Sequence, residues 1–99
     1  RYGARARVLL EEARAAVASL IGAQPAEIVF TSGATEANDL ALRGALPAGG
    51  RLVVTAVEHA SVLAPARALG ATGTPLTEVA VDAAARIAPG AVAEATCAT

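Results

Sequence analysis

The sequence predicts an α/β fold in which helices alternate with mostly parallel strands. Residues 4–21 place their apolar side chains at the three- and four-residue spacing of one helix face. Residues 51–57 form a nearly continuous apolar run, which is typical of a strand covered on both faces of a sheet. Helical and extended segments then alternate at a spacing that favours right-handed crossovers between parallel strands.

The first half of the chain is expected to contain two helices and one strand. The first helix covers residues 4–21, and Gly22 and Pro25 mark its end. Residues 27–31 are rich in β-branched and aromatic side chains, so they predict a short buried strand. A second helix is expected from about residue 35 to residue 44.

The second half is expected to continue the same alternation. The strand at residues 51–57 leads to a helix over about residues 60–69, and a further strand follows at residues 76–81. Pro89 suits the first turn of a short last helix that extends to about Ala95. Since the sequence contains no internal repeat and no low-complexity linker, residues 1–99 are predicted to form part of a single domain.

Composition limits the possible functions. The 99 residues carry a formal charge of -1, so charge gives no support to a nucleic-acid partner or an anionic membrane. Just over half of the hydrophobic residues are Ala, which predicts a thin core and poor folding of the chain alone. A single cysteine, Cys97, excludes an internal disulfide and favours a reducing, cytoplasmic compartment. No apolar run approaches the roughly 20 residues of a membrane span.

Two residue types are missing from the chain. Because it contains no Met and starts with Arg1, we expect it to be an internal piece of a longer protein. It also contains no Lys, so all eight basic residues are Arg. Any chemistry that needs a lysine side chain must therefore come from outside these residues.

The first candidate site is the turn between the predicted strand at residues 27–31 and the helix that follows. The backbone amides of Gly33, Ala34 and Thr35 could converge on an anion at the helix N-terminus, which suits a phosphate. The alternative is structural: Ser32 caps the helix and Gly33 only permits a tight turn. Glu36 offsets the helix dipole, and we expect its side chain to point away from the turn, where it would not repel a phosphate.

The second candidate site is the turn after the strand at residues 51–57, which carries the single histidine, His59. An imidazole there could stack on a flat ligand or transfer a proton, although a capping or solvated histidine is the alternative. If the two strands are neighbours, both turns face one crevice. Asn38 and Asp39 either support the first turn or face water, and Cys97 is expected to be inert. The pattern contains no metal-ligand cluster and no dinucleotide-binding glycine triplet.

Two segments together carry a family resemblance. Residues 30–38, FTSGATEAN, and residues 58–63, EHASVL, resemble the amino-terminal part of the large domain of cysteine desulfurases. These enzymes belong to the class V aminotransferase group of pyridoxal-phosphate enzymes and have the aspartate-aminotransferase type of fold, known as fold type I. Residues 2–7 and the later pair Val81 and Asp82 fit the same pattern, so the resemblance extends over nearly the whole chain.

The resemblance implies a cofactor, pyridoxal 5'-phosphate, and a role for each candidate turn. It implies that Gly33, Ala34 and Thr35 hold the cofactor phosphate. It also implies that His59 stacks on the pyridine ring and takes part in proton transfer as a catalytic residue. The reaction would remove sulfur from L-cysteine, giving alanine and an enzyme persulfide for iron-sulfur cluster assembly or sulfur transfer. The intact parent would be a homodimer that delivers sulfur to an acceptor protein.

The chain also departs from the family pattern. The cofactor-binding lysine and the catalytic cysteine loop of the family lie beyond these residues, so the chain alone is expected to be inactive, and Cys97 does not take the catalytic role. Asp39 stands where asparagine is usual. Three alternatives remain: another class V aminotransferase or lyase, a non-catalytic phosphate-binding module, and a remnant that does not fold independently.

Overall fold

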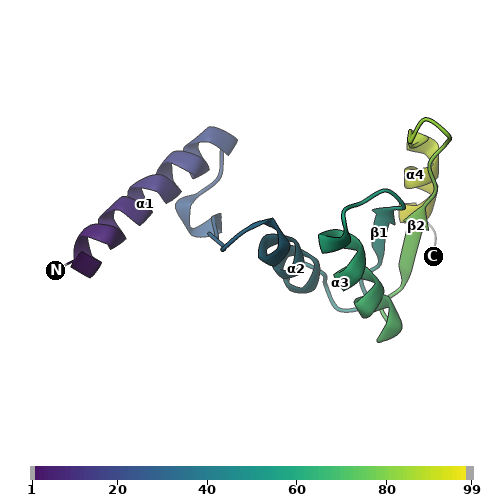
Figure 1. Cartoon of the computed structure of the whole chain (residues 1–99), viewed down its shortest axis with the longest axis horizontal. Coiled ribbons are helices and arrows are strands. Elements are labelled where there is room, and N and C mark those ends of the chain that lie inside the picture. Colours follow the sequence, from purple (N-terminus) through teal and green to yellow (C-terminus); the bar gives the residue numbers. More distant parts are fainter. Residues whose placement is uncertain (1, 98–99) are drawn as a thin grey trace. The chain divides into compact units, whose positions relative to one another are not determined.

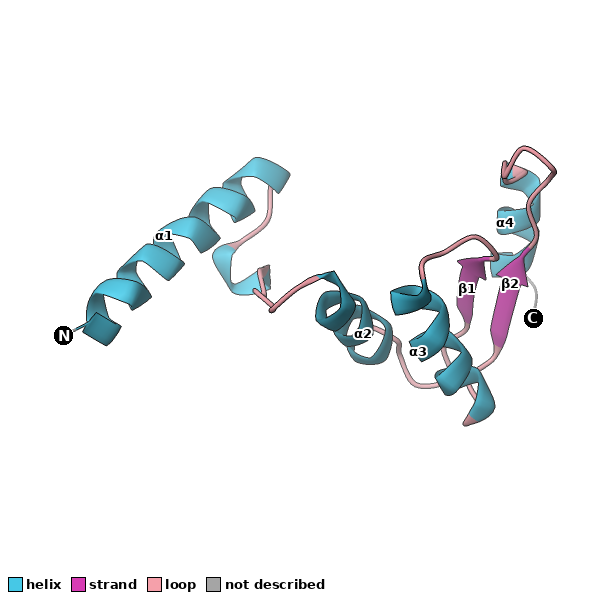
Figure 2. Cartoon of the chain, viewed as in Figure 1, coloured by secondary structure: helices cyan, strands magenta, loops and turns pink. Residues whose placement is uncertain are grey.

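The computed structural model describes residues 2–97, which form five helices and two strands (Figure 2). In chain order these are α1 (Tyr2–Ile21), a short 3-10 helix (Pro25–Glu27), α2 (Ala34–Gly44), β1 (Leu52–Thr55), α3 (Ala60–Ala71), β2 (Leu76–Val79) and α4 (Pro89–Cys97). The backbone divides into two compact units, with the boundary between Thr31 and Ser32. Within the described residues, no helix is both long and apolar enough to cross a membrane.

The end of α1 follows the sequence prediction. Gly22 adopts a left-handed φ of 71°, and the amide of Ala23 donates to the carbonyl of Ala18 at 2.8 Å. The amide of Gly22 donates to Ser19 at 3.4 Å, so the helix ends in a Schellman motif. Glycine is suited to this position because it adopts positive φ without steric cost.

The prediction of a buried strand at residues 27–31 is wrong. Pro25–Glu27 forms a turn of 3-10 helix, and residues 28–31 pair with no strand among residues 2–97. The side chains in this segment are also not buried, since Val29 is 65% exposed and Phe30 is 41% exposed. The β-branched composition was therefore insufficient, because a strand also needs a neighbouring backbone to complete its hydrogen bonds.

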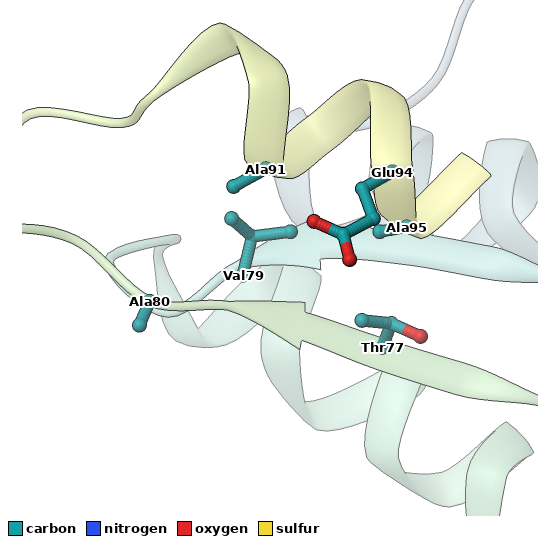
Figure 3. Close-up of a pocket in the computed structure, with 6 residues that line it drawn as sticks. All are labelled: Thr77, Val79, Ala80, Ala91, Glu94 and Ala95. Carbon is teal, nitrogen blue, oxygen red and sulfur yellow. The ribbon is translucent and has the colours of Figure 1, made fainter. Parts of the chain in front are cut away.

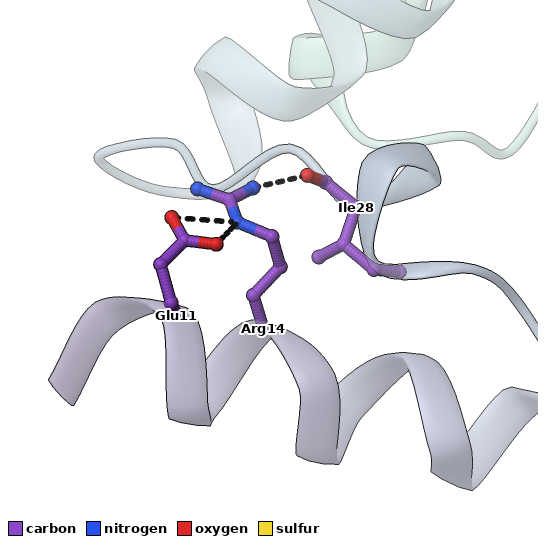
Figure 4. Close-up of polar contacts among 3 residues, drawn as sticks. All are labelled: Glu11, Arg14 and Ile28. Carbon is purple, nitrogen blue, oxygen red and sulfur yellow. Dashed lines mark hydrogen bonds and ion pairs between the residues drawn. The ribbon is translucent and has the colours of Figure 1, made fainter. Parts of the chain in front are cut away.

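Side-chain contacts from α1 account for the conformation of this segment. The Arg14 guanidinium donates to the carbonyl oxygen of Ile28 and pairs with Glu11 at 3.2 Å (Figure 4). The same guanidinium lies over the Phe30 ring, 5.1 Å from its centroid. Because Arg14 binds a backbone carbonyl and an aromatic side chain of this segment, it ties the segment to α1.

The second unit contains a parallel two-stranded sheet. β1 and β2 pair in the register Leu52 with Leu76 through Thr55 with Val79. Helix α3 packs on one face of this sheet and α4 on the other (Figure 1). The small core contains Val54, Ala66 and Val79, all less than 9% exposed.

The predicted alternation in this unit is confirmed, although the boundaries differ. Both strands are shorter than the apolar runs at residues 51–57 and 76–81 suggest, because parallel pairing covers only four residues of each. Helix α3 extends two residues beyond the expected end, and α4 likewise reaches Cys97. These differences are small compared with the loss of the strand at residues 27–31.

Helix α3 contains a proline in its interior, Pro65. Proline has no backbone N–H, so the carbonyl of Ser61, four residues earlier, cannot receive the usual helical hydrogen bond. The start of the helix is held instead by the carbonyl of His59, which accepts from the amides of Val62 at 2.9 Å and Leu63 at 3.1 Å. The first turn of α3 therefore has one helical hydrogen bond fewer than it would have without Pro65.

Candidate functional site

The N-terminus of α2 carries the backbone amides of the first candidate turn. Its N-cap is Gly33, which provides no side-chain cap, and Ala34 and Thr35 are exposed in the first turn. The first amides of a helix have no partner within the helix, and the dipole of this 11-residue helix places positive potential there. These features suit an anion such as a phosphate.

Gly33 contributes space rather than a special backbone conformation. Its φ of 169° and ψ of -178° describe extended backbone that any residue adopts, so no left-handed conformation requires a glycine there. A Cβ atom added at Gly33 would meet no atom of the chain within 4 Å. The space beside Gly33 is therefore open.

Ser32 and Glu36 form a hydrogen-bonded pair across the start of α2. One carboxylate oxygen of Glu36 accepts from the Ser32 amide at 3.1 Å and from the Ser32 hydroxyl. Two expectations are therefore wrong: Ser32 does not cap the helix, and Glu36 does not point away from the turn. The hydroxyl and amide donors of Ser32, in that order, hold the pKa of Glu36 below its ordinary value.

The lowered pKa of Glu36 predicts how this turn responds to pH. A carboxylate whose pKa is lowered by folding stabilises the structure above its unfolded-state pKa, and that contribution is lost as pH falls through the lowered pKa. We expect the NMR shift of the Ser32 amide to titrate with a midpoint below 4.5, the ordinary value for Glu. The titration should vanish in Glu36→Gln, and an identical titration in that variant would contradict the assignment.

His59 is the N-cap of α3. Its Nδ1 atom accepts from the Ser61 amide at 3.0 Å and lies 3.0 Å from the Ser61 hydroxyl oxygen. Because an amide N–H can only donate, Nδ1 is an acceptor and the neutral ring carries its proton on Nε2. His59 therefore caps a helix, as the structural alternative expected, and it is also exposed, so its ring is accessible to a ligand.

A hydrogen bond joins the starts of α2 and α3. The Asn38 amide donates from Nδ2 to the Ser61 hydroxyl oxygen at 2.9 Å, and both residues are half-buried. The helices that follow the two candidate turns therefore pack against each other, and the link between them does not come from neighbouring strands. Asp39, one residue later, pairs with Arg43 at 2.8 Å along the surface of α2.

The end of β1 also fixes the turn that carries His59. The Thr55 hydroxyl, on the last residue of the strand, donates to the Glu58 carboxylate at 2.8 Å. Sequence reasoning missed both this contact and the bond between Asn38 and Ser61. Two signals in the sequence could have indicated these contacts. Thr55 is a polar residue at the end of an apolar strand, and Ser61 is a polar residue at the second position of a helix. Both signals are weak.

The grooves of the second unit lie elsewhere. The larger has a volume of about 370 Å³ and lies between β2 and α4, where the Glu94 carboxylate extends over Thr77 (Figure 3). Neither this groove nor the smaller one beside α2 is lined by Thr35 or His59. The candidate site is therefore defined here by its hydrogen bonds and not by either of these two grooves. No group of three potential metal ligands occurs in the described part of the chain.

Comparisons with known proteins identify the family of the chain. The model of the family Aminotransferase class-V matches residues 1–97. The chain is 48% identical over 90 residues to a cysteine desulfurase of Frankia sp. and 44% identical over 85 residues to a human cysteine desulfurase. These matches cover 87% and 82% of this chain, but only 22% and 19% of the two relatives.

A solved structure gives the same result. The crystal structure of DndA from Streptomyces lividans matches with a TM-score of 0.70 and 42% sequence identity, over 79% of this chain and 23% of that chain. The expected α/β architecture and the resemblance to cysteine desulfurases are therefore confirmed, and the chain spans about a fifth of the length of its relatives. On the family match and these similarities, the chain belongs to the class-V aminotransferase family.

Proposed function

We propose that the protein carrying this chain is a pyridoxal-phosphate-dependent cysteine desulfurase. Residues 1–99 would form part of its cofactor-binding large domain. The observation that carries the proposal is the 2.9 Å bond between Asn38 and Ser61, which links α2 to the start of the helix that His59 caps. The similarity to cysteine desulfurases supports the choice of reaction.

The α2 N-terminus has the donors that a phosphate group needs. In the proposal, the amides of Gly33, Ala34 and Thr35 and the Thr35 hydroxyl hold the cofactor phosphate. The open space beside Gly33 supports a close approach of that phosphate. The Glu36 carboxylate accepts from Ser32, so part of its charge is balanced by donors of the chain.

In the proposal, His59 provides a flat ring and a proton carrier beside that phosphate site. In the proposal, its exposed imidazole stacks on the pyridine ring of the cofactor and exchanges a proton at Nε2. When bound, the cofactor supplies the electron sink that weakens the carbon–sulfur bond of L-cysteine. Stacking would keep the imidazole close to the reacting substrate.

Other parts of the enzyme must come from outside the chain. The chain has no Lys, so the lysine that binds the cofactor is proposed to lie elsewhere in the protein, as is the cysteine that receives sulfur. We propose that the protein is a cytoplasmic homodimer and that an acceptor protein takes its sulfur for iron-sulfur cluster assembly or sulfur transfer.

The experiment is an assay of the complete protein with bound pyridoxal phosphate. L-cysteine should yield equal amounts of alanine and sulfur, the latter recovered as sulfide in the presence of a reducing thiol. The same protein stripped of cofactor serves as the control. If the protein transfers amino groups without releasing sulfur, another class V aminotransferase replaces this proposal. If it binds no pyridoxal phosphate, the enzymatic proposal fails.

A further inference from the structure

Asn38, Ser61 and His59 form a continuous chain of hydrogen bonds that extends from α2 to the imidazole. We propose that Asn38 is a positioning residue for His59 and acts through the hydroxyl of Ser61. The role of Asn38 would be to set the orientation and the tautomer of the histidine ring.

The direction of each hydrogen bond follows from the groups involved. The Nδ2 atom of Asn38 can only donate, so the Ser61 oxygen accepts this bond. The Ser61 hydroxyl proton is then directed toward the remaining neighbour, His59 Nδ1, at 3.0 Å. Nδ1 consequently receives two donors, the hydroxyl and the amide of Ser61.

Two donors at Nδ1 have two effects on the imidazole. They restrict rotation of the ring about its side-chain bonds, and they favour the tautomer with its proton on Nε2. The ring would therefore be held with its donor atom directed away from Ser61. This inference rests on the proposed function only in assuming that His59 Nε2 faces the cofactor and substrate.

The sequence near Asn38 supplies a matched control. Asp39 is the adjacent residue on the same helix, yet it pairs with Arg43 and makes no bond to α3. The variant Asp39→Asn exchanges a carboxylate for an amide, the reverse of Asn38→Asp, at a position outside the hydrogen-bonded chain of Asn38, Ser61 and His59. By contrast, Asn38→Asp keeps the size of the side chain and replaces the donor with an acceptor. The Ser61 hydroxyl would then donate to the new carboxylate, and its oxygen could accept a proton from His59 Nδ1.

The test is nitrogen NMR of the complete protein, labelled with ¹⁵N-histidine and free of cofactor, at a pH where the ring is neutral. Protonated and unprotonated ring nitrogens have well-separated shifts, and the His59 signals are those that disappear in His59→Asn. We expect the Nε2–H tautomer in the wild type and in Asp39→Asn. In Asn38→Asp the Nδ1–H tautomer should gain a measurable population, although this form gives up the bond from the Ser61 amide.

A second pair of variants covers the case in which Asn38→Asp fails to fold. Ser61→Thr keeps the hydroxyl, whereas Ser61→Val has the same shape without it. We expect Ser61→Thr to keep the wild-type tautomer and Ser61→Val to gain a measurable Nδ1–H population. An unchanged tautomer in Ser61→Val and in any folded Asn38→Asp protein would overturn the proposal.

Activity of the cofactor-loaded enzyme separates this inference from the proposed function. Asn38→Asp should lower kcat about tenfold, less than removal of the imidazole itself, with little change in KM. If the tautomer changes in Asn38→Asp but loss of the His59 ring leaves desulfuration intact, the proposed role of His59 fails and the positioning by Asn38 stands. If loss of the ring abolishes desulfuration but Asn38→Asp changes neither tautomer nor kcat, only the positioning inference fails.

Discussion

Replacement of His59 by Ala is expected to lower the rate of sulfur release by about a hundredfold or more. This is the usual contribution of a positioned side chain that transfers a proton in the transition state. Cofactor retention should change much less, because the proposed phosphate donors lie on α2 and not on the imidazole. The measurements are kcat with L-cysteine and the cofactor content of the purified protein.

The helix cap requires a second variant at the same position. Nδ1 of His59 caps α3, so His59→Ala also removes a cap that is worth about 1 kcal/mol of stability. His59→Asn supplies a side-chain oxygen that can accept from the Ser61 amide, and it therefore keeps the cap while removing the ring. Both variants should lose activity, and only His59→Ala should lose stability. Full activity in His59→Asn would remove the catalytic assignment.

Replacement of Thr35 by Val is expected to weaken retention of pyridoxal phosphate by about tenfold or more. A hydrogen bond to a charged group contributes about 1.5–3 kcal/mol, and valine has the shape of threonine without its hydroxyl. Thr35→Ala should have an effect in the same direction. The dissociation constant can be measured by titrating the cofactor-free protein and following the absorbance of the bound cofactor.

The matched control is Thr35→Ser, which keeps the hydroxyl and should retain the cofactor almost as well as the wild type. Thr35 is exposed in the first turn of α2, so none of these variants should change the stability of the cofactor-free protein greatly. Equal retention by Thr35→Val and Thr35→Ser would show that the hydroxyl does not bind the phosphate.

The helices were predictable from sequence because their signals are local. The three- and four-residue spacing, the stop at Gly22 and Pro89 in a first turn all act within a few residues. The strand at residues 27–31 failed because strand formation depends on a distant partner. Instead, the side chain of Arg14 binds the Ile28 carbonyl, and no periodicity reports such a contact.

The site was only partly predictable for the same reason. The turn before α2 and the histidine after β1 were visible as polar residues at the ends of apolar segments. The bond from Asn38 to Ser61 joins residues 23 positions apart, and it depends on how α2 packs against α3. The orientation of the Glu36 side chain was predicted wrongly. An interaction with the helix dipole does not determine where the carboxylate points, and in the structure the carboxylate accepts hydrogen bonds from Ser32.

Pro65 gives the start of α3 an unusual dependence on side chains. Since the Ser61 carbonyl lacks its helical partner, the order of this turn depends more strongly on the His59 cap and on the Asn38 bond. Folding of the first turn of α3 and orientation of the His59 ring would then be coupled, so that a change in one changes the other. A molecule that fixes the ring would also order the turn, and a change that frays the turn would release the ring.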